Sequence, residues 1–156
     1  MPYPRAVLPD GVLAVQQYLR GLAEVTALID AAKIVTELPK APVYPYVIVQ
    51  WAGGLGHWPA MDEPAIQIDV IGGTKFACGL LTRTVRAAMW AIANDVVPEG
   101  VLVSGQEEVA PSWLPDTIPI PPLPRYVARY RVLTHANGDA DPYPNSTTYP
   151  SLTIFP

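Results

Sequence analysis

Residues 65–95 carry the sequence AIQIDVIGGTKFACGLLTRTVRAAMWAIAND, in which two different apolar periods follow one another. Over residues 65–72, Ile and Val alternate with Gln and Asp, which is typical of a β-strand with one buried face. Over residues 75–95 the apolar positions recur every three or four residues, the spacing of one helix face. This stripe comprises Phe76, Leu80, Leu81, Val85, Ala88, Met89 and Ile92. The stretch therefore predicts a strand followed directly by an amphipathic helix.

The residues before this stretch predict a first helix and two strands. A helical spacing over residues 10–32 places Val12, Val15, Leu19, Leu22, Thr26 and Ile29 on one face. Asp10 is a suitable N-cap, because its carboxylate can accept from the first free backbone N–H groups. Residues 34–38 and 46–52 are predicted strands, the second rich in β-branched and aromatic residues. The Gly53–Pro64 segment, between the strand at 46–52 and the strand at 65–72, is predicted to be a loop that joins these two strands in an antiparallel pair.

The residues after the second helix predict two more strands and two proline-rich segments. Residues 101–109 and 125–135 are the strands, and in the latter Arg129 and Arg131 face away from the apolar side. Pro111–Pro124 is predicted to be an excursion outside the ladder, because proline has no backbone N–H to donate. Residues 136–156 show no period and are predicted to form an extended arm.

Together these elements predict an α+β fold. Consecutive strands mostly pair antiparallel, so we expect a twisted sheet of four to five strands with two helices packed on one face. Residues 1–135 would form a single domain, and residues 136–156 a C-terminal arm outside it.

The composition favours a subunit that buries surface against partners. Half of the 156 residues are hydrophobic, but only 15% are charged, which is low for a freely diffusing monomer. The formal charge of −4 and the lack of a basic cluster argue against sequence-specific nucleic-acid binding. No apolar run reaches the roughly 20 residues that span a membrane, and no signal peptide is recognisable. We therefore expect a protein made in a cytoplasm.

No set of residues indicates catalysis, a cofactor or a metal. Gly53–Gly56 lacks the remaining residues of a nucleotide-binding loop, and His57 and His135 have no neighbours at ligand spacing. The lone Cys78 excludes an internal disulfide and is expected to be a packed, inert thiol. The paired acids are explained as solvated turns. We therefore expect a protein that is not an enzyme.

Apolar and aromatic residues lie where a small monomer has little use for them, in predicted loops and in the arm. Such residues are enriched at the cores of interfaces. The arm either adds as a strand to the sheet edge of a neighbour or folds back over its own core. With the two outward-facing arginines, the candidate interface residues are Trp58, Trp113, Leu114, Arg129, Arg131, Tyr143, Tyr149, Leu152, Ile154 and Phe155.

The order of elements resembles that of the tail-terminator, or tail-completion, family of long-tailed bacteriophages. The resemblance covers residues 11–135 and is carried by structural motifs rather than by single residues. These motifs are VTALI at 25–29, PYVIV at 45–49, IQIDV at 66–70, LLTRTVRAAM at 80–89 and the closing strand Tyr126–Thr134. The Pro111–Pro124 excursion and the arm depart from the family pattern.

The resemblance implies a structural virion protein that forms a hexameric ring. Such a ring caps the tail tube at its head-proximal end, stops tube growth and offers a surface for head attachment. The implied partners are other copies of the chain, the major tail tube protein and a head-to-tail connector or stopper protein, with the genome passing through the ring. The implied location is the virion, after assembly in the bacterial cytoplasm.

Other hypotheses for the function remain open. A neck subunit of the head-to-tail connector has a related fold, and the sequence does not separate it from a terminator. A small enzyme with an unrecognised site, or an adaptor that binds a peptide at its sheet edge, is the remote alternative.

Overall fold

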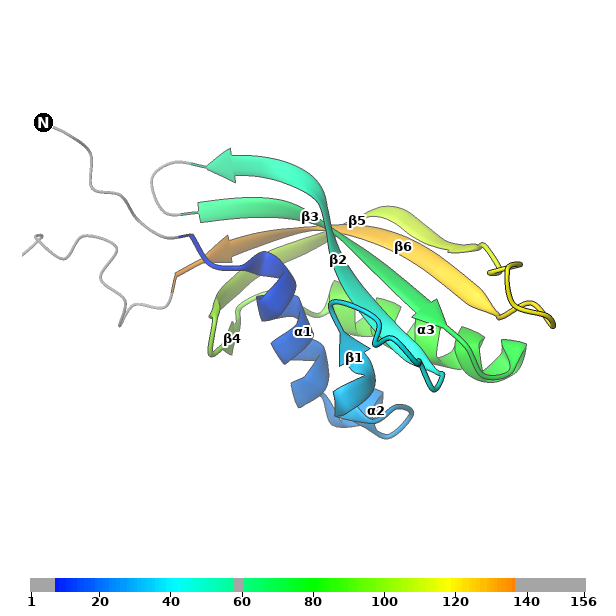
Figure 1. Cartoon of the computed structure of the whole chain (residues 1–156). Coiled ribbons are helices and arrows are strands. Elements are labelled where there is room, and N and C mark those ends of the chain that lie inside the picture. The colour runs from blue at the N-terminus through cyan, green and yellow to red at the C-terminus, as the bar shows by residue number, and fades with distance from the viewer. Residues whose placement is uncertain (1–7, 58–60, 137–156) are drawn as a thin grey trace, which may run out of the picture.

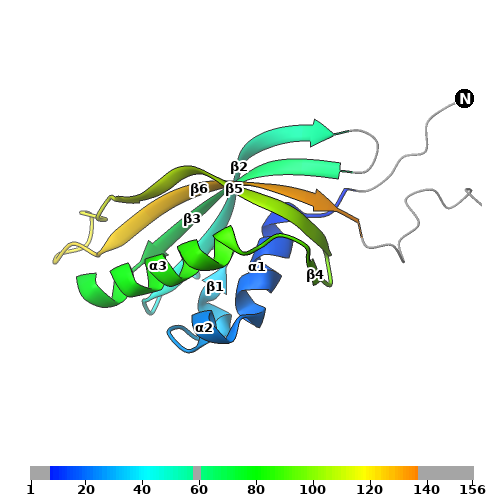
Figure 2. The ribbon, with the colours of Figure 1, turned by 180° about the vertical axis from the view of Figure 1, so that it is seen from behind.

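The computed structural model describes residues 8–57 and 61–136, which form a curled sheet with helices against one face (Figure 1; Figure 2 shows the reverse side). In chain order the elements are α1 (Gly11–Gly21), α2 (Ala23–Thr26), the 3-10 turn η1 (Ala31–Lys33), β1 (Ile34–Val35), β2 (Tyr46–His57), β3 (Met61–Ile71), α3 (Lys75–Trp90), β4 (Asp95–Val97), β5 (Gly100–Trp113) and β6 (Arg125–His135).

The sheet has the strand order β1-β2-β3-β6-β5-β4. β1 pairs parallel with β2, and the other neighbours pair antiparallel. The predicted α+β class and the β2–β3 pairing are therefore confirmed, whereas the strand number was underestimated. The six strands described include β4, whose three residues are too few to show a period.

The predicted first helix is broken at Leu22, whose backbone is extended (φ −90°, ψ 121°). The Asp10 cap is confirmed, because its carboxylate accepts from the backbone N–H groups of Val12 and Leu13 at 3.0 and 3.1 Å. After the break the helix face shifts by one residue, so that Val25 is buried and Thr26 is exposed. Gly21, the residue before the break, has low helix propensity.

The core lies between α1, α3 and the sheet. Leu81, Val85 and Met89 of α3 pack against inward residues of β3 and β6, as the helical stripe predicts. Phe76 was wrongly placed in that stripe: its side chain is 78% exposed, because it lies in the first turn of α3, away from the core. Cys78 takes the buried position, and burial raises the pKa of its thiol, which agrees with an inert packed residue.

The β2–β3 hairpin is longer than the sequence predicts, so the proposed loop at 53–64 is wrong for most of its length. The strands pair as far as His57 and Met61, with an irregularity between Trp51 and Gly54. Gly54 has φ +148°, and a Cβ there would lie 2.6 Å from the backbone of Glu63 and Pro64. Glycine therefore allows the strands to stay paired at this bulge.

The proline excursion begins later than predicted. Pro111, Ser112 and Trp113 belong to β5, where Ser112 pairs with Val127 across a register shift. Proline is tolerated because β4 pairs only with Gly100–Leu102, which leaves the outer side of β5 without a described partner at Pro111. The remaining loop closes with an isolated bridge between Asp116 and Leu123.

Candidate assembly surface

The sheet face turned away from the main core carries charges that are paired with one another. Asp69, only 4% exposed, accepts from Arg125 of β6 through Nε at 3.0 Å and Nη2 at 2.5 Å. Arg131 forms ion pairs with Glu63 and Glu108 on the two flanking strands. Because these charges pair across neighbouring strands, they are partly neutralised within the molecule and are less available to a partner.

One end of the sheet presents an apolar loop, here called the loop end. Ile118 and Ile120 are 90% and 96% exposed in this loop, and Trp113, Leu114 and Phe76 lie at the same end, where β5 finishes and α3 begins. The loop has a defined shape, since Asp116 and Leu123 exchange two backbone hydrogen bonds of 3.0 and 2.9 Å. A shaped loop with large apolar side chains in water is typical of a contact surface.

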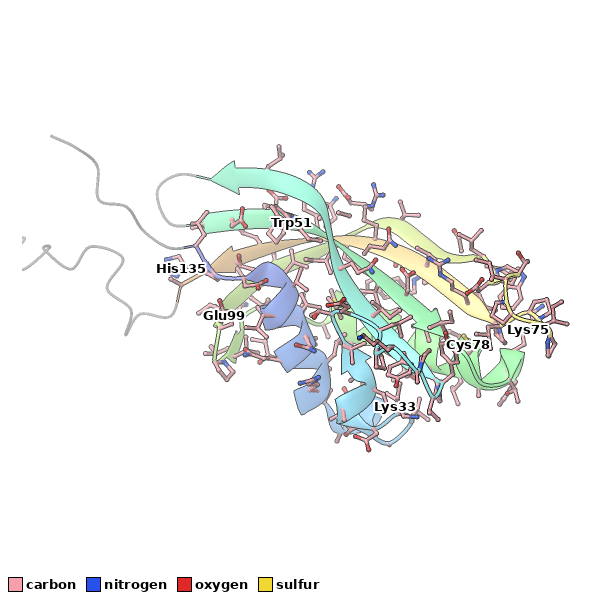
Figure 3. The ribbon with its side chains drawn as sticks, viewed as in Figure 1. Lys33, Trp51, Lys75, Cys78, Glu99 and His135 are labelled. Carbon is pink, nitrogen blue, oxygen red and sulfur yellow. The ribbon has the colours of Figure 1, made fainter. Side chains whose placement is uncertain are left out.

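Trp113 anchors this loop to the body of the protein. Its ring meets that of Tyr126 edge-on, with 5.1 Å between centroids. The Lys75 ammonium lies 4.7 Å from the Trp113 centroid, and Figure 3 shows Lys75 at this end of the molecule. The loop therefore rests on both the sheet and the start of α3.

The opposite end of the sheet, here called the hairpin end, carries a second apolar group. Trp51 (71% exposed), Leu55 and Met61 lie on the distal part of the β2–β3 hairpin. Trp51, Asp62 and Pro64 also border a shallow hollow of about 260 Å³ against the start of α1. This hollow has both apolar and acidic walls and is open to solvent.

Strand register fixes the separation of the two ends. β6 begins at the loop end, where Tyr126 pairs with Trp113, and finishes at the hairpin end, where His135 pairs with Met61. Its 11 residues span roughly 33 Å at about 3.3 Å per residue. The two apolar groups of one molecule therefore cannot cover each other. The loop end of one copy can, however, cover the hairpin end of a second copy.

Between the two ends, the helix side carries a compact polar cluster. Arg86 of α3 donates two hydrogen bonds, of 2.8 and 2.7 Å, to the carboxylate of Glu107 on β5. Trp90 donates to the same carboxylate at 3.2 Å, and its ring lies 4.7 Å from the Arg86 guanidinium. The hydrogen bonds from Arg86 lower the pKa of the Glu107 carboxyl. This arrangement clamps α3 to β5.

Within residues 8–57 and 61–136, no three His, Cys, Asp or Glu side chains gather as a metal site would require. His135 lies at the hairpin end, where its Nδ1 is 2.5 Å from the carbonyl oxygen of Ala136. None of the helices in the same ranges combines the length and apolar character needed to cross a membrane.

The structure places four of the ten predicted interface residues. Trp113 and Leu114 are exposed at the loop end, Arg129 is exposed on the polar sheet face, and Arg131 lies there in its ion pairs. The other six lie outside the described residues: Trp58, Tyr143, Tyr149, Leu152, Ile154 and Phe155. Their part in an interface remains a prediction.

Sequence reasoning missed Ile118 and Ile120, the two most exposed large apolar residues among those that the structure describes. A signal was present, because each isoleucine stands next to a proline inside a segment that was correctly expected to leave the sheet. Trp51 and Leu55 were missed for other reasons. Trp51 lies near the end of a predicted strand, where its exposure could not be foreseen, and Leu55 lay in the segment wrongly predicted to be a loop.

Neither a protein-family model nor a curated protein sequence matches the chain. Among solved structures, it is similar to a chain from the virion of a native gene transfer agent particle, with 20% sequence identity and a TM-score of 0.59. The similarity covers 81% of this chain and 95% of that chain. At this identity the likeness establishes a shared α+β fold.

Proposed function

We propose that this chain is a structural virion protein that assembles into a hexameric ring and caps a phage tail tube at its head-proximal end. The observation that carries the proposal is the pair of apolar groups at opposite ends of one sheet. Two different surfaces on one subunit make a head-to-tail contact, which closes into a ring when the rotation between subunits allows it.

Two further observations support a virion role. The structurally similar chain belongs to a virion particle, and the likeness spans nearly all of that chain. The low share of charged residues also suits a subunit whose surface is largely covered in an assembly. In this role the chain catalyses nothing, and its partners are its own copies, the tube protein and a head-connector protein.

The first experiment measures the mass of the purified protein by light scattering over a range of concentrations, with and without tail-tube protein. Growth to a hexamer, alone or only on tube ends, is the expected result. A monomer that ignores tube protein at every concentration would contradict the terminator role.

A matched pair of variants tests the observation itself. Ile118→Ser with Ile120→Ser removes the apolar tip of the loop end and should abolish assembly without loss of stability, because both side chains are almost fully exposed. Leu28→Ser is the control, since Leu28 is also exposed but lies in the turn after α2, away from both sheet ends. Equal assembly by the two variants would argue against a loop-end interface.

The second candidate is a neck subunit between the tube and the head. The structural likeness favours it equally, because it concerns a virion chain without distinguishing tail from neck. Pull-down with tube protein and with connector protein separates the two: retention by the connector alone would favour the neck subunit.

A further inference from the structure

The sheet has two long edges that no described strand covers. β1 pairs only with Val47 and Ile48, so no described strand covers that side of β2 from Val49 onward, and within this stretch the Gly53 carbonyl accepts from the Trp51 Nε1–H. β4 pairs only with Gly100–Leu102, so β5 is open beyond Leu102. An open edge presents unpaired backbone N–H and C=O groups to any strand of suitable shape.

The two edges differ in how they resist such pairing. β5 has three register shifts in its open part, together with Pro111 and the acidic pair Glu107–Glu108. These devices normally protect an edge from a foreign strand. Val49–Gly56 of β2 has no charged residue and no proline, and its glycines at 53, 54 and 56 let another backbone approach closely. The β2 edge is therefore the accepting one.

The sequence supplies a segment that fits this edge. Ser151–Phe155, SLTIF, is a proline-free stretch between Pro150 and Pro156, and it alternates like a strand. Five residues extend about 17 Å, which is shorter than the open part of β2. The flanking prolines limit an added strand to about this length, since proline cannot join a ladder.

The place where the arm leaves the fold also suits this edge. His135, next to the last described residue, pairs with Met61 at the hairpin end, where the open part of β2 lies. The outer side of β2 is about 15 Å from β6 at the usual strand spacing. Residues 137–150 can extend roughly 45 Å, enough for the edge of the same copy or of a neighbour.

We propose that Ser151–Phe155 adds as a strand to the open edge of β2, and that in the ring this segment comes from the neighbouring copy. The first half of the inference stands on the β2 edge alone, whereas the exchange between copies rests on the proposed ring. Backbone hydrogen bonds would provide the affinity, and the two faces of the segment would meet the exposed Trp51 side chain on one side of the sheet and the Leu55 side chain on the other.

Disulfide trapping in the full chain tests both halves. Leu55→Cys with Thr153→Cys places one thiol on the edge and one in the segment, while the native Cys78 is buried and should not react. Under mild oxidation we expect a disulfide in severalfold higher yield than in the control pair, Val109→Cys with Thr153→Cys. Val109 is exposed on the protected β5 edge and serves as the matched site.

The gel pattern without reductant separates the outcomes. A ladder of linked chains supports the exchange between copies. A single linked chain of altered mobility supports the β2 edge and overturns the exchange. A yield no higher than the control overturns the inference, and if light scattering still shows a ring, the proposed function survives that result.

Discussion

The two ends of the sheet are both apolar, but they are built differently. At the loop end, Trp113 rests on Tyr126 and Lys75, and a short bridge holds the loop in one shape. At the hairpin end, Trp51 and Leu55 stand on a glycine-rich strand with an open edge. The difference suggests that the loop end is a preformed projection, whereas the hairpin end is a sheet edge to which a further strand can be added on contact.

Changing Gly54 should break the hairpin end most severely. Gly54→Val puts a branched side chain at φ +148° and within 2.6 Å of the backbone of Glu63 and Pro64. We expect a loss of about 3 kcal/mol in the free energy of unfolding. The loss cannot exceed the free energy needed to open the hairpin locally, because such opening would relieve the clash. Urea denaturation followed by circular dichroism measures it.

Gly56→Val is the matched control for that change, because a Cβ at Gly56 meets nothing within 4 Å. It should change the stability by no more than about 0.5 kcal/mol. Equal losses in the two variants would show that the bulge does not depend on Gly54.

Removing the anchor of the loop end should have a smaller effect. Trp113→Ala deletes the edge-on contact with Tyr126 and the ammonium contact with Lys75, which together are worth about 1–2 kcal/mol. Trp51→Ala at the hairpin end should cost no more than about 0.5 kcal/mol, because that ring is mostly exposed. Thermal unfolding of the two variants compares the ends directly, and a larger loss for Trp51→Ala would reverse the distinction.

The smallest expected effect concerns the Arg86–Glu107 pair, which joins α3 to β5 between the two ends. The pKa of Glu107 is lowered in the folded protein, so its stabilising contribution is present above the unfolded pKa and is lost as pH falls through the lower folded value. Glu107→Gln should therefore lose less stability than the parent protein between about pH 6 and about pH 3. Denaturation midpoints across this range test the sign, and parallel curves would exclude a role for the Arg86–Glu107 pair.

Local patterns predicted the interior better than the surface. The alternation in β3 and β6 and the stripe in α3 identified Ile66, Ile68, Tyr130 and Met89 as inward residues, because burial selects apolar side chains at fixed periods. The break at Leu22 and the long hairpin were missed. Both depend on what packs next to the chain rather than on its own period, and tertiary packing readily overrides local propensity.

The candidate surface was predictable only in part. Trp113 and Leu114 attract notice because large apolar residues stand among prolines, and the structure exposes both. Arg131 looked equally available, but its guanidinium pairs with acids from two strands that are distant in sequence. No local pattern reveals such a pair, because charges across a sheet meet only after the strands align.

The sequence by itself determined the α+β class, the Asp10 cap of the first helix and the inward faces of the strands, because hydrophobic period and capping chemistry act over a few residues. Only the tertiary structure decided that two apolar groups lie at opposite ends of one sheet and that β2 keeps an open edge. Those features depend on strand order and register, which arise from contacts between residues far apart in the chain.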